Sequence, residues 1–308
     1  MYVIKRLFTM IVTLWIIATL TFIMMHFIPG DPFASDAKML PDEILENMRA
    51  KYNLDKPLAE QYFLYMKDLA QFDLGPSIQS KTRDVNTLIA EGFGPSALLG
   101  MQSLVIALVL GIGLGIIAAL NHNRMLDYLS MFIAIIGISI PSFILAPLLI
   151  KYFGVEWGIF PVASWGTWQH TILPSFALAL GPLAIIARFV RTSMLEVYNQ
   201  NYIKTAEAKG LSTFSVVVNH GIRNALIPVI SFIGPLFAAI ITGTFVIEKI
   251  FAIPGIGKYF VDSIFNRDYP VILGTTIFYS IILIITLFII DLAYRFVDPR
   301  IKLTSRGE

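Results

Sequence analysis

The stretch "PGIGKYF", residues 254–260, is where the sequence comes nearest to a phosphate-binding loop. Such a loop needs a lysine followed by Ser or Thr, whose hydroxyl binds the magnesium ion of the nucleotide. Here Tyr259 follows Lys258, and no strand pattern precedes the segment. We therefore expect no ATP hydrolysis by this chain.

The glycines, serines and histidines of the chain are likewise not spaced as a cofactor-binding, catalytic or metal site requires. "GIGLG", residues 111–115, lies in an apolar run and lacks the last spaced glycine of a dinucleotide loop, so it predicts close helix packing instead. An intramembrane serine protease would need a serine and a histidine facing each other at depth. Ser139 and Ser142 lie in an apolar run, but the only histidine within such a run, His26, lies at its outer end. The chain has no cysteine, and its four histidines are not spaced as metal ligands are. They are His26, His122, His170 and His220. The sequence predicts no catalytic site, no metal site and no cofactor of its own.

The composition indicates a membrane protein. Of 308 residues, 56% are hydrophobic and 14% charged, with a mean hydropathy of +0.73, whereas roughly a quarter of an average soluble domain is charged. The net charge of +2 is dispersed along the chain. It forms no basic stripe for phosphate contacts, so no nucleic-acid partner is expected.

Apolar runs long enough to cross a bilayer recur along the chain. They predict an all-α polytopic membrane protein with six transmembrane helices. The runs are Leu7–Ile28, Leu98–Leu120, Tyr128–Ile150, Ile172–Ala187, Ala225–Ile247 and Val271–Ile290. The first is too long for a cleaved signal core, so we expect a retained anchor.

The distribution of Lys and Arg predicts the topology. These residues gather in the connections that are inside if the N-terminus is cytoplasmic, which places both termini in the cytoplasm. We expect an N-terminal segment with the first span over 1–29 and an extracytoplasmic region over 30–97. A five-helix core over 98–308 follows, with a cytoplasmic coupling segment at 191–224.

The long outer loop predicts helices of its own. "PDEILENMRAKY" begins with proline and acids and ends with basic residues, as suits a helix dipole. "PLAEQYFLYMKDLAQ" repeats this pattern. Their apolar stripes suit packing on the outer ends of the spans, or a partner. The stripes are Ile44, Leu45, Met48 and Tyr52, then Leu58, Tyr62, Tyr65, Met66 and Leu69.

The predicted spans have no ionisable residue at mid-depth. A charge there is costly and persists where it is used, for example in ion coupling. This argues against an ion-coupled secondary carrier, which uptake without ATPase subunits would reveal. A membrane enzyme is a second alternative, and no paired nucleophile and base supports it.

The longest inner segment predicts two helices with a glycine between them. "NYIKTAEAK" is a short helix ended by Gly210, which adopts the left-handed conformation most easily. Ser212 can cap the next helix. That helix has an apolar stripe of Phe214, Val217, Val218, Gly221, Ile222 and Ala225. From the residues alone, the segment is either a handle for another protein or a loop lying on lipid.

The sequence resembles the permeases of ABC importers at several places in order. "YIKTAEAKG" and "NHGIRNALIPV" look like the cytoplasmic EAA loop in the oligopeptide/dipeptide branch. "FIPGDPF", "YNLDKPLAEQY", "DLGPS", "GISIPSF", "AIPGIGK", "NRDYP" and "DPR" extend the likeness along most of the chain. The chain is most similar to the B-type, or first, permease subunit of an oligopeptide transporter. This implies the type I ABC-importer permease architecture.

The resemblance also implies a site and partners. The loop resembles a coupling helix that contacts the ATPase, formed by Ile203, Lys204, Thr205, Ala206, Glu207, Ala208, Lys209, Gly210 and Leu211. The implied partners are a second homologous permease, two cytoplasmic ATPase subunits that hold ATP and Mg, an extracytoplasmic peptide-binding protein and membrane lipid. The family's Glu-Ala-Ala positions are Lys204, Thr205 and Ala206 here, so Glu207 is not the motif glutamate. Ala206 and Ala208 are expected to be small because a partner's wall comes close.

The function implied is import of short peptides across the cytoplasmic membrane of a bacterium, by a multi-pass subunit that is not an enzyme. Relatives of similar sequence carry dipeptides, glutathione, nickel complexes or opines, and these stay as alternatives for the cargo. Cargo choice in this family resides largely in the binding protein.

Overall fold

The structure is a computed structural model of the 308-residue chain. It describes residues 2–27, 32–33, 41–80, 82–212, 215–222, 225–226, 236–237, 240 and 245–297. Within these ranges every regular element is a helix, with an isolated β-bridge between Pro76 and Asp84. The all-α fold class predicted from the sequence is confirmed.

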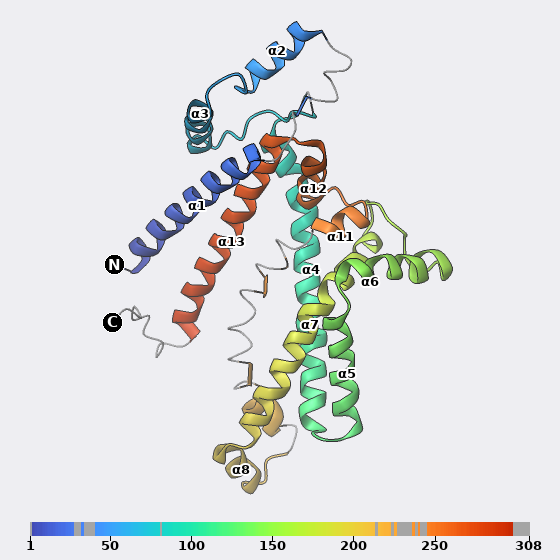
Figure 1. The fold of residues 1–308 in the computed structure, drawn as a ribbon. Helices are drawn as coiled ribbons and strands as arrows, with labels where there is room; N and C mark the ends of the chain where they lie inside the picture. Colours follow the sequence, from blue (N-terminus) through green and yellow to red (C-terminus); the bar gives the residue numbers. More distant parts are fainter. Residues whose placement is uncertain are drawn as a thin grey trace. The chain divides into compact units, whose positions relative to one another are not determined.

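Figure 1 shows the helices in chain order. Their bounds are α1 Tyr2–Phe27, α2 Asp42–Lys51, α3 Leu58–Ala70, α4 Val85–Leu120, α5 Met125–Ser139, α6 Ser142–Leu149, η2 Ile150–Glu156, α7 Gln169–Tyr198, α8 Asn201–Ala208, η3 Val216–Ile222, α11 Phe245–Ile250, α12 Ile256–Asn266 and α13 Tyr269–Val297. Two of them, η2 and η3, are π-helices.

Four helices of the described ranges are long and apolar enough to cross a membrane: Ile4–Phe27, Val85–Leu120, Gln169–Tyr198 and Tyr269–Ile290. They contain or overlap the first, second, fourth and sixth predicted spans. The fourth predicted span ends at Ala187, whereas α7 continues to Tyr198. Arg188 and Arg191 therefore belong to this helix and not to the loop after it.

The third predicted span is not one straight helix. The chain from Tyr128 to Ile150 is divided into α5 and α6, and the pair α5 and α6–η2 is bent by 102°. Pro141 explains the break, because proline lacks an N–H group and pushes the residue before it out of the helical region. Ile140 has φ −97° and ψ 112°, an extended conformation. With this bent pair the candidate spans number up to five.

The fifth predicted span, 225–247, lies for the most part outside the described residues. Helix α11 begins at Phe245 and covers its end.

The chain divides into two compact units. Unit 1 comprises residues 1–94 and 254–285, and unit 2 comprises residues 95–253 and 286–308. Unit 1 contains α1, α2, α3, α12 and the first part of α13. Unit 2 contains α5, α6, α7, α8 and α11, with most of α4. Each unit is described by itself.

In unit 1 the loop helices pack on the spans, as the first of the two sequence alternatives predicts. Tyr62 and Tyr65 of α3 pack against Phe22 of α1 and Ile272 of α13. The Tyr62 hydroxyl also forms a hydrogen bond of 2.7 Å with that of Thr19.

The stripe of α2 is buried in the same manner, against a loop of unit 1. Leu45 packs with Phe33 and Ile78, and Met48 and Tyr52 lie against this cluster. The end of the predicted stripe differs, since Ile44 is 45% exposed. The α2 stripe is therefore narrower than its sequence suggests.

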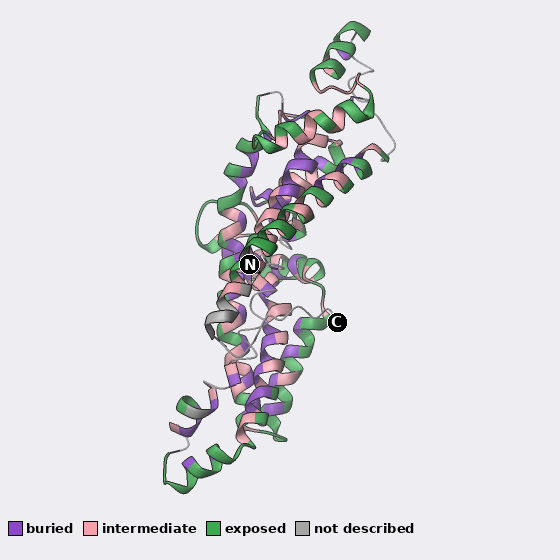
Figure 2. Cartoon of the chain, turned by 90° about the vertical axis from the view of Figure 1, so that its left-hand side faces the viewer, coloured by how far each residue is buried: buried purple, intermediate pink, exposed green. Residues whose placement is uncertain are grey.

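Helix α7 is the central helix of unit 2. Half of the residues in the most apolar stretch of α7 are buried, against 11% in that of α1. Figure 2 shows the chain coloured by the burial of each residue. Buried residues of α4 and α7 share one cluster, and α5 and α6 also pack on α7. Because α4, α5 and α6 all pack on α7, this helix organises the unit.

Glycines bring α4 and α5 close to α7. A Cβ on Gly111 would lie 2.8 Å from the Leu183 carbonyl oxygen, and one on Gly115 would lie 2.6 Å from Val190 Cβ. On α5, a Cβ on Gly137 would lie 2.8 Å from the Leu180 carbonyl oxygen. The expectation that "GIGLG" permits close helix packing is confirmed.

Candidate functional site

Helix α8 ends in the glycine turn that the sequence predicts. Gly210 has φ +79°, in the left-handed region. Its N–H donates to the Glu207 carbonyl at 2.9 Å, and the Leu211 N–H donates to the Ala206 carbonyl at 3.4 Å. These two bonds are the pattern of a Schellman motif, which satisfies the last carbonyls of the helix.

The segment after this turn carries the predicted cap, but the helix that follows is not the α-helix that was expected. The Ser215 N–H donates to Ser212 Oγ at 3.3 Å, so the predicted cap is present. The segment Val216–Ile222 is a π-helix, η3. A wider turn brings i and i+5 to one face, and Val216 and Gly221 are both buried, whereas Val218 is 39% exposed. The predicted stripe is nevertheless largely confirmed: Val217, Gly221 and Ala225 are buried, and Ile222 packs against the core cluster that contains Val217 and Ala225. Val218 departs from it, and Phe214 lies outside the described residues.

Helix α8 has an inner and an outer face. Ile203 and Ala206 are 1% and 6% exposed, and they pack with Val216 of η3 and with Val197 and Tyr198 of α7. Ala206 is therefore small because its own chain surrounds it, and the expectation that a partner requires its size is wrong. The sequence period could not show which face of so short a helix turns inward.

The outer face of α8 carries the other predicted site residues. It is exposed at Lys204, Thr205, Glu207, Ala208, Lys209, Gly210 and Leu211. Seven of the nine predicted residues thus form one exposed surface, and the remaining two anchor it. This surface combines the charged side chains of Lys204, Glu207 and Lys209 with the exposed Leu211, a mixture suited to contact with another protein.

Helix α8 is tied closely to the central helix. Only Asn199 and Gln200 separate it from α7, and the Asn199 side chain donates to the Leu195 carbonyl at 2.9 Å. The Ile203 N–H donates to the Gln200 carbonyl at 3.2 Å. A displacement of α8 therefore acts directly on the end of α7.

An ion pair connects α7 to the first turn of α5. Arg191 Nε donates to Asp127 Oδ1 at 2.6 Å, and its Nη2 donates to Oδ2 at 2.8 Å. The Asp127 side chain is 3% exposed and also accepts from the Asn123 N–H at 3.0 Å. His122 Nδ1 lies 3.3 Å from Arg191 Nη2. No local sequence pattern predicts this cluster, because Asp127 precedes an apolar run and its partner is distant in sequence.

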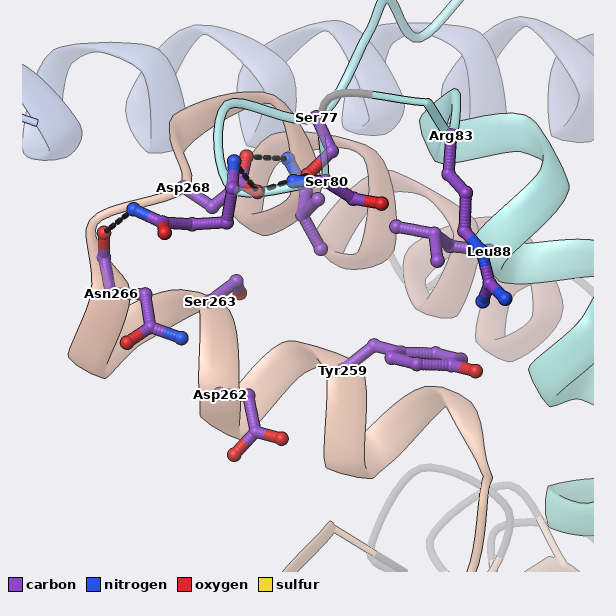
Figure 3. Close-up of a pocket in the computed structure, with 11 residues that line it drawn as sticks. Ser77, Ser80, Arg83, Leu88, Tyr259, Asp262, Ser263, Asn266 and Asp268 are labelled. Atoms are coloured by element: carbon purple, nitrogen blue, oxygen red, sulfur yellow. Dashed lines mark hydrogen bonds between the residues drawn. The ribbon is translucent and has the colours of Figure 1, made fainter.

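Unit 1 contains a pocket of about 210 Å³, most of whose lining residues are polar types; Figure 3 shows them. One wall is α12, with Tyr259, Asp262 and Ser263, and the other is the segment from Ser77 to Leu88. At its edge the Asp268 carboxylate accepts from the Ser77 hydroxyl and from the Ile78 and Gln79 N–H groups, each of the latter at 3.1 Å. These bonds fasten the segment to the start of α13.

Two family models cover most of the chain. Residues 111–303 match the family described as "Binding-protein-dependent transport system inner membrane component", and residues 1–78 match its N-terminal counterpart. The chain belongs to this family. The permease is accordingly a membrane-embedded transport component and not itself an ATPase, and ATP belongs to other subunits.

Relatives match the permease along its whole length. It is 55% identical over 306 residues to the dipeptide transport system permease protein DppB of Bacillus subtilis (strain 168), with 99% of each chain covered. It is 43% identical over 303 residues to the oligopeptide transport system permease protein OppB of Escherichia coli (strain K12), covering 98% of this chain and 99% of that one. The expected likeness to B-type permeases is confirmed.

Solved structures agree on the fold. The permease has a TM-score of 0.57 and 20% identity to a chain of the MetNI methionine ABC transporter, with 68% of this chain and 96% of that chain covered. For an amino acid ABC transporter the TM-score is 0.55 at 14% identity, with 68% and 94% covered. The permease therefore has an ABC-importer permease fold, and its transport system uses ATPase subunits and a binding protein.

Proposed function

We propose that the permease forms one half of a pore that imports short peptides across the cytoplasmic membrane. A second homologous permease forms the other half, two ATPase subunits bind the cytoplasmic side, and a peptide-binding protein delivers cargo from outside. The names of the relatives support peptides as cargo: DppB is a dipeptide and OppB an oligopeptide transport permease. In this arrangement the permease crosses the membrane six times, as a type I importer permease, with both termini in the cytoplasm.

The ATPase contact in this proposal is the segment 203–211. The observation that carries it is the division of α8 into two faces: Ile203 and Ala206 fix it to α7 and η3, while its polar side is exposed. A loop resting on lipid would instead present apolar side chains outward. Lys204, Glu207 and Lys209 are exposed, which favours contact with a polar protein surface.

The geometry supports a lever mechanism. ATP closes the ATPase pair and draws the α8 segments of the two permeases together, which tilts the spans toward the outward-facing state. Hydrolysis separates the ATPase subunits and restores the inward-facing state. Because α8 joins α7 through only Asn199 and Gln200, the movement enters unit 2 through its central helix.

Ala208→Trp tests the contact. Ala208 is exposed, so we expect a Trp there to be tolerated by the fold but to clash with an ATPase seated on α8. We expect the ATPase subunits to be lost on co-purification and peptide uptake to fall, while the chain still inserts. Ala50→Trp, at an exposed alanine of α2, is the matched control and should retain both. Full complex yield and uptake with Ala208→Trp would show that α8 rests on lipid, where a Trp is tolerated.

Cargo length requires its own measurement. The 55% identity to DppB favours dipeptides, whereas the 43% identity to OppB favours longer peptides. Uptake of radiolabelled dialanine and trialanine by cells that hold the complete transporter distinguishes them. Uptake of neither peptide would refute the peptide assignment, and glutathione or nickel complexes would then be the cargoes to test. Uptake that persists without the ATPase subunits would instead indicate an ion-coupled carrier.

A further inference from the structure

The contacts of α7 change in kind toward its C-terminal end, from close packing against glycine to an ion pair. At Leu183 and Val190 the neighbour is a glycine of α4, which permits close packing. Immediately after Val190, Arg191 forms the ion pair with Asp127. Arg191 thus links α7 to the first turn of α5, seven residues before α7 ends at Tyr198 and the α8 segment follows.

The two kinds of contact resist different movements. Packing against glycine is non-directional, so it holds two helices together but allows one to rotate or slide against the other. A bidentate arginine–carboxylate pair has a fixed plane and direction, so it resists both movements. The pair is also sheltered, since the Asp127 side chain is 3% and the Arg191 side chain 25% exposed.

Two neighbouring groups fix the position of the Asp127 carboxylate. The Asn123 N–H donates to its Oδ2 at 3.0 Å, and His122 Nδ1 lies 3.4 Å from the same oxygen. Both residues belong to the turn between α4 and α5. Asp127 is therefore fixed to that turn, and Arg191 is its connection to α7.

We propose that Asp127 and Arg191 are positioning residues that transmit the movement of α8 to the α4–α5 hairpin. The proposal rests on the proposed function of 203–211 as the ATPase contact. Without the pair, α7 would turn or slide when α8 is displaced, and ATP would be hydrolysed with little movement of α4 and α5. The pair thus sets how much transport each hydrolysed ATP produces. A purely structural pair would alter stability but not this ratio.

The experiment measures ATP hydrolysis and uptake of whichever of dialanine and trialanine the wild-type transporter imports, together, on the complete transporter with its binding protein in proteoliposomes. Asp127→Asn keeps the shape of the side chain but removes its charge, and Arg191→Lys keeps the charge but removes the bidentate fork. Arg188→Lys, at an exposed position of the same helix, is the matched control. Co-purification of the ATPase subunits is measured for each variant. Because none of these substitutions changes α8, the ATPase subunits should still bind.

For Asp127→Asn and Arg191→Lys we expect assembly and hydrolysis to persist while peptide imported per ATP falls about tenfold. Arg188→Lys should keep the wild-type ratio. An unchanged ratio in both pair variants would overturn the proposal, and so would loss of assembly in both, since the pair would then serve folding alone. Failure of the ATPase contact is seen separately, as normal ATPase recovery with Ala208→Trp.

Discussion

Asp268 shows how one buried carboxylate organises part of unit 1. Its side chain accepts from the Ser77 hydroxyl and from the N–H groups of Ile78 and Gln79, and Asp268 is 3% exposed. Each of these donors would cost about 1–3 kcal/mol if buried without an acceptor. The carboxylate also lies near the Val271 N–H, at the start of α13. One residue therefore caps a helix and holds the loop beside it.

We expect Asp268→Ala to loosen this loop and to destabilise unit 1 by about 3 kcal/mol, because several donors lose their acceptor. Limited trypsin digestion of the purified permease measures the effect, as faster cleavage after Arg83. Asn266→Ala is the control: its side chain is exposed, and only its backbone carbonyl accepts from Gln79. Equal cleavage rates in the Asp268→Ala and wild-type proteins would contradict the assigned role.

Gly210 tests the turn of the coupling segment. Its φ of +79° is the obstacle to a side chain, since a Cβ there would meet nothing within 4 Å. We expect Gly210→Val to strain the turn by roughly 1–3 kcal/mol and to reduce peptide uptake, while the spans stay inserted. Gly210→Asn should retain more uptake, because asparagine tolerates the left-handed region. Equal uptake by the two variants would show that the turn geometry is unimportant.

At the scale of helices, α4 and α7 offer an internal comparison. Gly111 and Gly115 face α7, whereas a Cβ on Gly113 would meet nothing within 4 Å. We expect Gly115→Ala to lower the thermal unfolding midpoint of the purified permease, as overpacking costs about 1–3 kcal/mol. Gly113→Ala should leave it unchanged or raise it slightly, because alanine favours a helix. The reverse order of the two midpoints would refute the close contact of α4 with α7.

Local signals in the sequence predict much of the helical structure. Pro41 and the acids after it predict α2, and Gly210 with Ser212 predicts the turn after α8, because these effects act within a few residues. The break at Pro141 also has a local signal, but the apolar run around it masks the bend. Composition measures only whether a segment suits lipid, and both halves of the bent pair do.

Contacts between distant segments could not be predicted in this way. Asp127 and Arg191 meet because α5 packs on α7, which no local pattern in the sequence encodes. The inner face of α8 likewise depends on η3, whose π-helical turn departs from the expected period of 3.6. The sequence predicts where the coupling segment lies. The structure adds which of its residues are buried against the rest of the chain and which are exposed.

At the scale of the molecule, each unit contains a segment whose side of the membrane can be tested. In unit 2, α8 and the α4–α5 turn lie at the same end (Figure 1), joined through the Arg191 ion pair. In unit 1, α3 lies at the C-terminal end of α1, where His26 Nε2 is 3.1 Å from Gln61 Oε1. If the N-terminus is cytoplasmic, α3 is outside and the residues before α8 are inside.

Single cysteines test this topology, because the native chain has none. Gln71, at the end of α3, and Asn199, between α7 and α8, are both exposed. In spheroplasts we expect an impermeant maleimide to label Gln71→Cys but not Asn199→Cys, since a charged reagent cannot cross the bilayer. After permeabilisation both should react, which controls for their accessibility. Labelling of Asn199→Cys alone in intact spheroplasts would reverse the orientation and remove α8 from the side where ATPase subunits bind.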